Sequence, residues 1–215
     1  MDRRSHWDNV YHTKPATEVS WFEAEPTNSL SLIQSVAPSG GRLIDVGGGA
    51  SLLVDRLVAA GTWDVTVLDV SATALELAQA RLHEQGNRVE WIQADITEVQ
   101  QLGTYDIWHD RAVVHFLTAL DDRAAYLARL RRALRDGGHV ILGTFALNGP
   151  EKCSGLPVCR YDARSLAATL GTDYSLVQTL EHSHPTPGGT TQLFTFAVFR
   201  KGDQPSASKA QTERG

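Results

Sequence analysis

A chain of 215 residues has the size of one globular domain, and it is long enough to bury a full hydrophobic core. Asp and Glu (25) outnumber Lys and Arg (20), so the formal net charge is −5 and a nucleic-acid substrate is not expected. No apolar run approaches the ~20 residues that span a bilayer, the polar N-terminus is unlike a signal peptide, and two cysteines in one loop do not make a disulfide framework. These observations predict a cytoplasmic protein that does not act on membranes.

Residues 1–40 precede the first predicted strand and are expected to form a cap segment. They predict a short helix near the N-terminus and a second helix over residues 29–36, which a Pro-Ser-Gly-Gly sequence ends. The segment also contains two aromatic pairs, Trp7 with Tyr11 at helical spacing and Trp21 with Phe22. These side chains either cover one edge of the core or close over a ligand, and the sequence leaves both interpretations open.

The sequence L-I-D-V-G-G-G-A-S, residues 43–51, predicts a buried parallel strand that ends in a tight turn and leads into a helix. Glycine lacks a Cβ atom, so such a turn lets a ligand approach backbone N–H groups at a helix N-terminus. Asp69 follows Gly49 by 20 residues and ends a second apolar run. A βαβ unit places an acid at that position to hold the two ribose hydroxyls of a nucleoside cofactor.

The glycine pattern disfavours a nicotinamide dinucleotide as this cofactor. Such a dinucleotide requires G-x-G-x-x-G, and the third glycine is missing because Gly49 is followed by Ala50, Ser51 and Leu52. Asp45, two residues before the first glycine, would also repel a pyrophosphate. The same carboxylate suits a ligand that carries positive charge.

From residue 43 onward strands and helices alternate, which is typical of a parallel sheet covered by helices on both faces. A helix that begins after its N-cap residue Ser71 leads to a third strand, which ends at Asp95. Asp95 either caps the short turn over residues 96–99 or contacts a ligand, because ligands bind at the carboxyl ends of strands in such sheets.

A fourth strand, predicted over residues 105–108, is followed by a concentration of polar side chains. Four of them fall within seven residues, which a packed strand end does not require: His109, Asp110, Arg111 and His115. We interpret them as candidates to orient or deprotonate a second substrate. The alternatives are that Asp110 and Arg111 pair with each other and with the backbone, and that His115 is a buried core histidine.

The next helix is predicted to begin near Asp121 and to end at the sequence D-G-G, residues 136–138, before a fifth strand over residues 139–145. Residues 146–161 leave the carboxyl end of that strand. They are predicted to form a lid without regular structure, because long loops at this edge of a sheet are often functional.

The remaining elements complete the expected organisation of the chain. Residues 174–182 and 192–199 alternate apolar and polar side chains and predict an antiparallel hairpin that closes the sheet. The expected division is a cap segment (1–40), one domain (41–200) and a polar, disordered tail (201–215).

The order D-x-G-x-G, followed by an acid at the end of the next strand, resembles the S-adenosylmethionine (SAM) site of class I SAM-dependent methyltransferases. The resemblance extends from the cap to Phe199. It implies a Rossmann-like seven-stranded, mostly parallel sheet with a C-terminal antiparallel hairpin and helices on both faces. The runs W-H-D-R-A-V-V-H-F-L, G-P-E-K-C-S-G-L-P-V and H-x-T-P-x-G look like a group of small bacterial methyltransferases within this superfamily.

The resemblance implies SAM as the cofactor and assigns its contacts. Asp69 would hold both ribose hydroxyls, and Asp95 would accept a hydrogen bond from the adenine amino group. SAM carries a sulfonium and an α-ammonium, so a nearby carboxylate is favourable. The expected cofactor-binding residues are Asp45, Gly47, Gly48, Gly49, Asp69, Val70, Asp95, Ile96 and Trp21.

Methyl transfer from SAM needs an unprotonated nucleophile about 3 Å from the methyl carbon, opposite the departing sulfur. A base takes the acceptor proton if its pKa is high. The catalytic candidates are His109, Asp110, Arg111, His115, His184 and, in the predicted lid, Cys153. Cys153, Cys159, His182 and His184 offer soft-metal ligands, but C-x5-C is not a zinc signature and no metal is expected.

Three functions are compatible with these residues. The first is a methyltransferase that acts on a small-molecule acceptor in one in-line displacement, as a monomer or weak homodimer. The second is a protein lysine methyltransferase. The third is a nonenzymatic SAM-binding module, which would be expected to lack Asp45 or Asp69.

Overall fold

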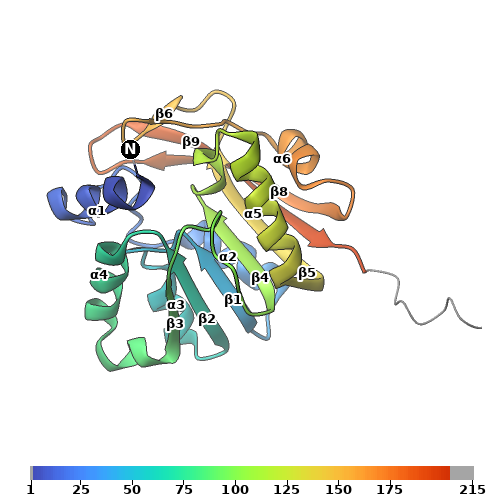
Figure 1. Ribbon diagram of the computed structural model, residues 1–215, viewed down its shortest axis with the longest axis horizontal. Coiled ribbons are helices and arrows are strands. Elements are labelled where there is room, and N and C mark those ends of the chain that lie inside the picture. Colours follow the sequence, from blue (N-terminus) through green and yellow to red (C-terminus); the bar gives the residue numbers. More distant parts are fainter. Residues whose placement is uncertain (1, 204–215) are drawn as a thin grey trace, which may run out of the picture.

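The computed structural model describes residues 2–203, and its strands form one seven-stranded sheet of order β3-β2-β1-β4-β5-β9-β8 with helices on both faces (Figure 1). The strands of this sheet are β1 (Gly41–Val46), β2 (Trp63–Asp69), β3 (Val89–Gln93), β4 (Tyr105–Arg111), β5 (Leu134–Phe145), β8 (Tyr174–Pro185) and β9 (Thr191–Lys201). The α-helices are α1 (Arg3–Thr13), α2 (Thr27–Val36), α3 (Leu53–Ala60), α4 (Ala72–Leu82), α5 (Leu120–Ala133) and α6 (Ala163–Leu170), and the 3-10 helices are η1 (His83–Arg88) and η2 (Val114–Phe116).

Strand direction confirms the predicted topology. The parallel pairs are β1 with β2, β2 with β3, β1 with β4, and β4 with β5. Strand β9 pairs antiparallel with both β5 and β8. The carboxyl ends of the parallel strands therefore meet at one edge of the sheet. Helix α1 lies beside this edge, above the start of α4 (Figure 1). No helix in the described part of the chain is long and apolar enough to cross a membrane.

Side chains alternate along β1 and enter two separate cores. Leu43 packs with residues of α2, α3 and α4 on one face of the sheet, whereas Ile44 and Val46 pack with residues of α5 and α6 on the other. The same alternation places Asp45 on the face of Leu43, toward α2. This assignment of faces decides which polar residues of β4 can meet Asp45.

Side chains cap the starts of two helices, and the cap of α4 at Ser71 confirms a prediction. Ser71 Oγ accepts a hydrogen bond from the N–H of Ala74 at the start of α4. Asp162 and Ser165 form a reciprocal capping box at the start of α6.

Besides the end of β4, which lies at Arg111 and not at residue 108, three predicted boundaries were wrong. Helix α5 ends at Ala133, and the D-G-G sequence lies inside β5, because Leu134 already pairs with Tyr105 of β4. The loop over residues 146–161 is not structureless but contains a short hairpin, β6 (Lys152–Cys153) and β7 (Leu156–Pro157).

The third boundary is that of the predicted tail. Lys201 is the last residue of β9, and its Nζ donates hydrogen bonds to the carbonyl oxygens of Arg131 and Leu134. These bonds tie the C-terminal end of the sheet to α5. Residues 204–215, the rest of the predicted tail, lie outside the described residues.

Candidate active site

Two connected pockets open at the carboxyl edge of the parallel strands. The glycine-turn pocket is lined by Asp45, Gly48 and Glu23 among others, and the aromatic pocket by Trp7 and Asp69 among others. They contain about 560 and 770 Å³ of empty space, counted out to their open mouths. They share four residues: Tyr11, Trp21, Gly47 and Arg111. The pockets therefore join at the edge of the sheet where ligands bind in such folds.

The turn after β1 has no room for side chains. Gly47 has φ 71°, and a Cβ atom there would lie 2.0 Å from Cγ2 of Val113. Gly49 has φ 38°, and its Cβ would lie 2.7 Å from Oδ2 of Asp69. The N–H of Gly47 donates to the carbonyl of Leu68 at 2.7 Å, which fixes the turn against β2. The turn therefore presents backbone, not side chains, to a ligand.

Asp69 ends β2 and lines the aromatic pocket as a buried carboxylate. Its Oδ1 accepts a hydrogen bond from the N–H of Ser71 at 2.8 Å, and within residues 2–203 no cation pairs with it. Burial raises the pKa of Asp69 to about 7, and the negative charges of Asp45 and Asp8 add to this increase. Hydroxyl groups of a ligand that donate hydrogen bonds to this carboxylate would stabilise its ionised form.

Asp45, His109 and Ser29 form a buried hydrogen-bonded chain on the α2 side of the sheet. Asp45 and His109 are register partners on β1 and β4, and Asp45 Oδ1 lies 2.7 Å from His109 Nδ1. The other ring nitrogen of His109 lies 2.9 Å from Oγ of Ser29 in α2. Both nitrogens of His109 are therefore engaged by the protein.

Arg111 holds the junction of the two pockets. Its Nη1 donates to the carbonyl of Trp21 at 2.8 Å, its Nη2 lies 3.1 Å from Glu23 Oε1, and its guanidinium lies over the ring of Phe194, 4.9 Å from the centroid. Burial lowers the pKa of Arg111, and the charges of Glu23 and Asp45 oppose that change. The guanidinium is thus a cation fixed in position at the place where the pockets meet.

The N-terminal aromatic residues meet over the aromatic pocket. The ring centroid of Trp7 lies 5.6 Å from that of Trp21 and 5.0 Å from that of Phe116, and Tyr11 lies 6.2 Å from Trp21. All three contacts are edge-to-face, a favourable geometry for aromatic pairs. Because these side chains line the pocket, the cap interpretation describes their position better than an edge of the core.

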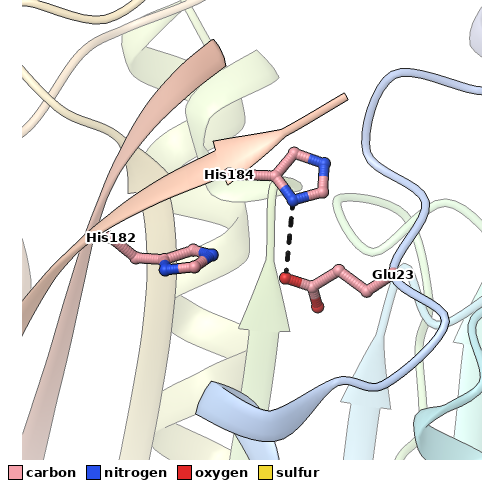
Figure 2. A group of neighbouring side chains, drawn as sticks. All are labelled: Glu23, His182 and His184. Atoms are coloured by element: carbon pink, nitrogen blue, oxygen red, sulfur yellow. Dashed lines mark ion pairs between the residues drawn. The ribbon is translucent and has the colours of Figure 1, made fainter. Parts of the chain in front are cut away.

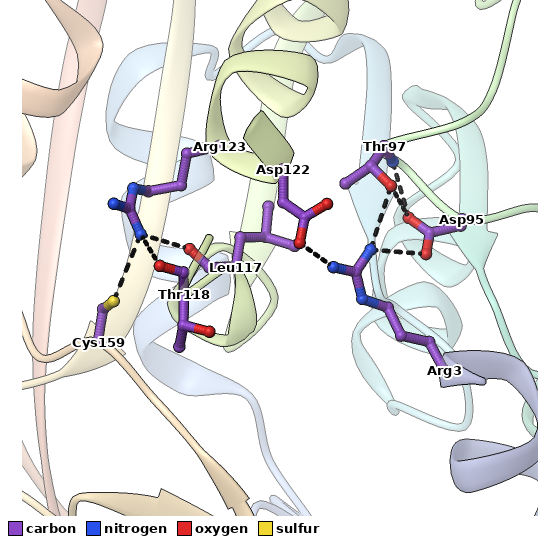
Figure 3. A network of polar contacts seen from close by, with 8 residues as sticks. All are labelled: Arg3, Asp95, Thr97, Leu117, Thr118, Asp122, Arg123 and Cys159. Atoms are coloured by element: carbon purple, nitrogen blue, oxygen red, sulfur yellow. Dashed lines mark hydrogen bonds and ion pairs between the residues drawn. The ribbon is translucent and has the colours of Figure 1, made fainter. Parts of the chain in front are cut away.

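Arg3 ties this cap to the body of the domain (Figure 3). Its Nη1 donates to Oδ2 of Asp95 at 2.9 Å and to Oγ1 of Thr97 at 3.1 Å, and its Nη2 pairs with Asp122 of α5. The contacts join segments 92 to 119 residues apart. Helix α1 is therefore held over the pocket from two sides.

Asp95 caps the turn that follows it and also lines the aromatic pocket. Its Oδ1 accepts hydrogen bonds from the N–H and Oγ1 of Thr97 at 2.8 and 2.7 Å, so it caps the following turn. It also lines the aromatic pocket, together with Ile96. Burial acts to raise its pKa, but hydrogen bonds from Thr97 and Arg3 outweigh this and lower the pKa of Asp95.

The predicted cofactor-binding residues gather at the two pockets. All except Gly49 line one pocket or both: Asp45, Gly47, Gly48, Asp69, Val70, Asp95, Ile96 and Trp21. Gly49 lies against Asp69, on the inner side of the turn.

The position of Asp110 does not support its prediction as a catalytic residue. β4 continues to Arg111, so His109 and Asp110 point to opposite faces of the sheet. Asp110 faces α5, where its Oδ2 accepts a hydrogen bond from Tyr126 at 2.7 Å and its Oδ1 accepts from the N–H of Val113 at 2.9 Å. It lines neither pocket, and burial raises its pKa to about 6. These hydrogen bonds make Asp110 a support of the strand end, on the face of the sheet that packs against α5.

His115 and His184 are also corrected as catalytic candidates. His115 is 0% exposed, packs against Phe116 and Phe145, and has a pKa lowered to about 3 by burial. It is the buried core histidine that the sequence allowed as an alternative. His184 is buried too, its Nε2 lies 2.9 Å from the carbonyl of Ser20, and it lines neither pocket.

The two cysteines have different surroundings. Cys153 is buried in β6 and lines the aromatic pocket, and burial raises the pKa of its thiol to about 11. It is therefore a neutral thiol near pH 7. Cys159 is a free cysteine whose Sγ lies 3.6 Å from Nη1 of Arg123, which also donates to the carbonyls of Leu117 and Thr118 (Figure 3).

Several pocket residues were not identified from the sequence, among them Arg3, Glu23, Ser29 and Phe116. Phe116 stands next to a candidate histidine, and this proximity was the only available signal. The other three come from the cap segment, and their partners are 80 or more residues away in the chain. No local pattern reports such contacts.

Comparison with known proteins agrees with the family that the sequence resembles. The family model described as a methyltransferase domain matches residues 44–140. The ubiquinone biosynthesis O-methyltransferase of Aromatoleum aromaticum is 29% identical over 144 residues, which cover 66% of this chain and 58% of the relative. The chain thus matches somewhat more than half the length of this curated relative.

Solved structures share the fold at low sequence identity. A structure described by the conversion of a disulfide bond into a thioacetal group during echinomycin biosynthesis has a TM-score of 0.77 and 18% identity, with 95% of both chains covered. The 1,6-didemethyltoxoflavin-N1-methyltransferase of Burkholderia thailandensis, solved with S-adenosylhomocysteine, has a TM-score of 0.70 and 20% identity, with coverage of 93% of this chain and 87% of that one. The sheet order and these likenesses show that the chain has the fold of class I SAM-dependent methyltransferases, and its residues 44–140 match the methyltransferase-domain model.

Proposed function

We propose that the protein binds SAM across the two pockets and transfers its methyl group to a small-molecule acceptor. The observation that carries this proposal is that the glycine turn and the Asp69 carboxylate lie in two pockets that join at Gly47 and Arg111. A nucleoside and an amino-acid group, linked through one sulfur, would occupy such a pair of pockets together.

The residues present fit this cofactor. Val70, Ile96 and the ring of Phe116 offer apolar contacts for adenine in the aromatic pocket, and Asp69 offers its oxygens to the ribose. Gly47 and Gly48 of the turn carry no side chain and so present backbone to the pockets. In the glycine-turn pocket, Asp45 supplies negative charge for an α-ammonium group.

Bound SAM would supply an electrophilic methyl group on a sulfonium. The chain's own residues would bind and orient the acceptor and exclude water. The walls of both pockets, within residues 2–203, offer no histidine with a free ring nitrogen, because His109 is engaged on both sides. Since Cys153 stays protonated near neutral pH, we infer that the acceptor arrives already nucleophilic, with a lone pair that needs no strong base.

The cover over the aromatic pocket favours a small acceptor over a protein lysine. Charge does not separate the two, because Arg111 and Arg3 are paired with Glu23 and Asp95, and Asp45 and Asp69 also line the pockets. The aromatic cap covers the aromatic pocket, which limits the size of what can enter. This feature supports a small molecule. A nonenzymatic binding module is not favoured, because Asp45 and Asp69 are both in place.

Two measurements test the proposal. Calorimetry should show that one equivalent of SAM or S-adenosylhomocysteine binds, whereas NAD gives no heat. Tritiated SAM is then incubated with the protein and a panel of thiols, amines, phenols and carboxylates, and labelled product is counted. SAM binding with transfer to a small acceptor supports the proposal. Transfer to proteins of a lysate alone, or SAM binding without transfer to any class, would contradict it.

A further inference from the structure

Three side chains of types that bind metals converge beside the glycine-turn pocket (Figure 2). Glu23 comes from the segment before α2, and His182 and His184 come from the end of β8. One ligand atom of each residue lies within 4.8 Å of the other two, and Glu23 Oε1 lies 3.8 Å from Nδ1 of His184. The resemblance that identifies the SAM site does not account for this group.

The hydrogen bond of His184 fixes which nitrogen faces the cluster. Its Nε2 lies 2.9 Å from the carbonyl oxygen of Ser20, and a carbonyl can only accept. Nε2 therefore carries the proton, and in the neutral ring Nδ1 presents its lone pair toward Glu23. Metal-ligating histidines are oriented in this way, by donation of the second nitrogen to a carbonyl or carboxylate. An imidazole lone pair and a carboxylate face each other here without a hydrogen between them.

His182 completes the group from the same strand face. Residues two apart on a strand project to the same side, so His182 and His184 both face α2, where Gln178 of the same strand donates to Ser35. The two rings lie 6.3 Å apart, centroid to centroid. Within residues 2–203, His182 makes no hydrogen bond or ion pair with the protein. Its ring is thus available to a ligand at little energetic cost.

We propose that Glu23, His182 and His184 bind a divalent transition-metal ion of the zinc type. Two imidazoles and one carboxylate form a ligand set that suits Zn²⁺ and leaves a fourth, open position for water. Metal–ligand bonds of about 2.0–2.2 Å bring tetrahedral ligands to about 3.4 Å from one another, so the three side chains would close by about 1 Å. That movement is within the reach of side-chain rotation from the two segments.

The position of Glu23 predicts an exchangeable ion, not a structural one. Glu23 Oε1 also pairs with Arg111 Nη2 at 3.1 Å, and the guanidinium weakens the attraction of the site for a second cation. Glu23 lines the glycine-turn pocket as well. Metal binding would therefore draw Glu23 away from Arg111, so the occupancy of the ion and the position of Arg111 are linked. The metal site itself does not depend on the proposed methyl transfer.

The test uses the purified full chain after treatment with a chelator. Co²⁺, which substitutes for Zn²⁺ and absorbs visible light, is titrated in, and Zn²⁺ is then added to displace it. We expect one equivalent of Co²⁺ to give a tetrahedral or five-coordinate spectrum that Zn²⁺ abolishes. His182→Ala and His184→Ala should each weaken binding by more than the roughly 10–100-fold loss caused by removing an outer-shell partner.

His182→Ala is the decisive variant, because His182 makes no hydrogen bond whose loss would unfold the chain. His139→Ala is the matched control. His139 lies in β5, paired with Ile107 of β4, and is remote from the cluster. Circular dichroism melting checks that each variant is folded. The proposal is overturned if the wild type gives no Co²⁺ spectrum, or if folded His182→Ala binds Co²⁺ as tightly as the wild type and His139→Ala do.

Discussion

Asp45 and His109, on neighbouring strands and in register, share a buried hydrogen bond of 2.7 Å, and Ser29 of α2 occupies the far side of the imidazole. The chain therefore places its most prominent histidine beside the predicted cofactor site without leaving it a free nitrogen. His109 is a positioning residue that holds Asp45 against the glycine turn. It differs in this respect from Arg111, which lies two residues further along β4 and faces the junction of the pockets.

The first prediction follows from this relationship. His109→Ala should leave the Asp45 carboxylate buried without its partner and lower the free energy of unfolding by about 1–3 kcal/mol. Affinity for SAM should fall at the same time, because Asp45 lines the glycine-turn pocket. Urea unfolding and calorimetry measure the two effects, and Ser29→Ala, which removes only the outer hydrogen bond, should show a smaller loss in both. A variant with full stability and affinity but reduced turnover would instead assign His109 a direct catalytic role.

The second prediction concerns the support of the strand end. Tyr126 donates to Asp110 at 2.7 Å and accepts from Nε1 of Trp108 at 2.8 Å, all within the core. Tyr126→Phe leaves Nε1 of Trp108 unsatisfied and removes one of the hydrogen bonds to Asp110, so it should lower the free energy of unfolding by about 1–3 kcal/mol in urea. Tyr174→Phe is the control, because the buried Oη of Tyr174 has no hydrogen-bond partner within residues 2–203, so its loss should change stability by less than about 0.5 kcal/mol. Equal losses in the two variants would contradict the assignment of Asp110 as a structural group.

The sequence was sufficient for the parts of the site that are encoded locally. The glycine turn and Asp69 follow from a strand, a turn and a second strand, and the structure places both at the same edge of the sheet. Asp110 was misassigned because the fourth strand was predicted to end at residue 108. Once β4 extends to Arg111, the alternation of side chains separates His109 from Asp110.

The rest of the site depends on contacts that no local pattern reports. Arg3 meets Asp95 across 92 residues, and Ser29 meets His109 across 80. The register of β1 against β4 and the docking of α1 and α2 bring these pairs together, and both are tertiary properties. From the sequence, Glu23 could not be distinguished from glutamates on the surface for the same reason.

The third prediction is a pH dependence that arises from Asp69. Its pKa is raised from 3.8 to about 7 in the folded protein. Between these values the folded chain holds a proton that the unfolded chain has lost, so the contribution of Asp69 to stability falls as pH rises from about 4 to 7. Asp69→Asn lacks this titration, and its stability relative to wild type should increase over that interval in urea unfolding. A difference that does not vary with pH would show that Asp69 ionises normally.

The fourth prediction is that affinity for the cofactor depends on the ionisation of Asp69 and changes with pH in the opposite direction to stability. Ribose hydroxyls donate to the ionised carboxylate, so affinity for S-adenosylhomocysteine should rise with pH and level off above about 7. Asp69→Ala should weaken binding of S-adenosylhomocysteine by about 2–4 kcal/mol near neutral pH. Calorimetry at several pH values measures both. Unchanged affinity in the folded variant would remove Asp69 from the cofactor site.

The last prediction concerns the 146–161 loop as a lid. Only Cys153 of this loop lines the aromatic pocket, and the hairpin β6–β7 that carries it is held by two register pairs. The following residues are better anchored, because the N–H groups of Cys159 and Tyr161 donate to the carbonyls of His115 and Phe145 at 2.8 and 2.9 Å. The part that can open is therefore the hairpin, between the end of β5 and this anchor.

We expect S-adenosylhomocysteine to slow hydrogen exchange in residues 150–157 and to leave residues 159–161, which are already bonded, almost unchanged. Cys153→Ser should keep most of the activity, since a neutral thiol with a pKa of about 11 lines the pocket without attacking. Cys153→Trp should fill the pocket and lower affinity for the ligand, whereas the same substitution at the exposed Leu147 should not. If the hairpin exchanges equally fast with and without ligand and Cys153→Trp binds normally, the loop is a surface hairpin and the pocket is closed by the N-terminal cap alone.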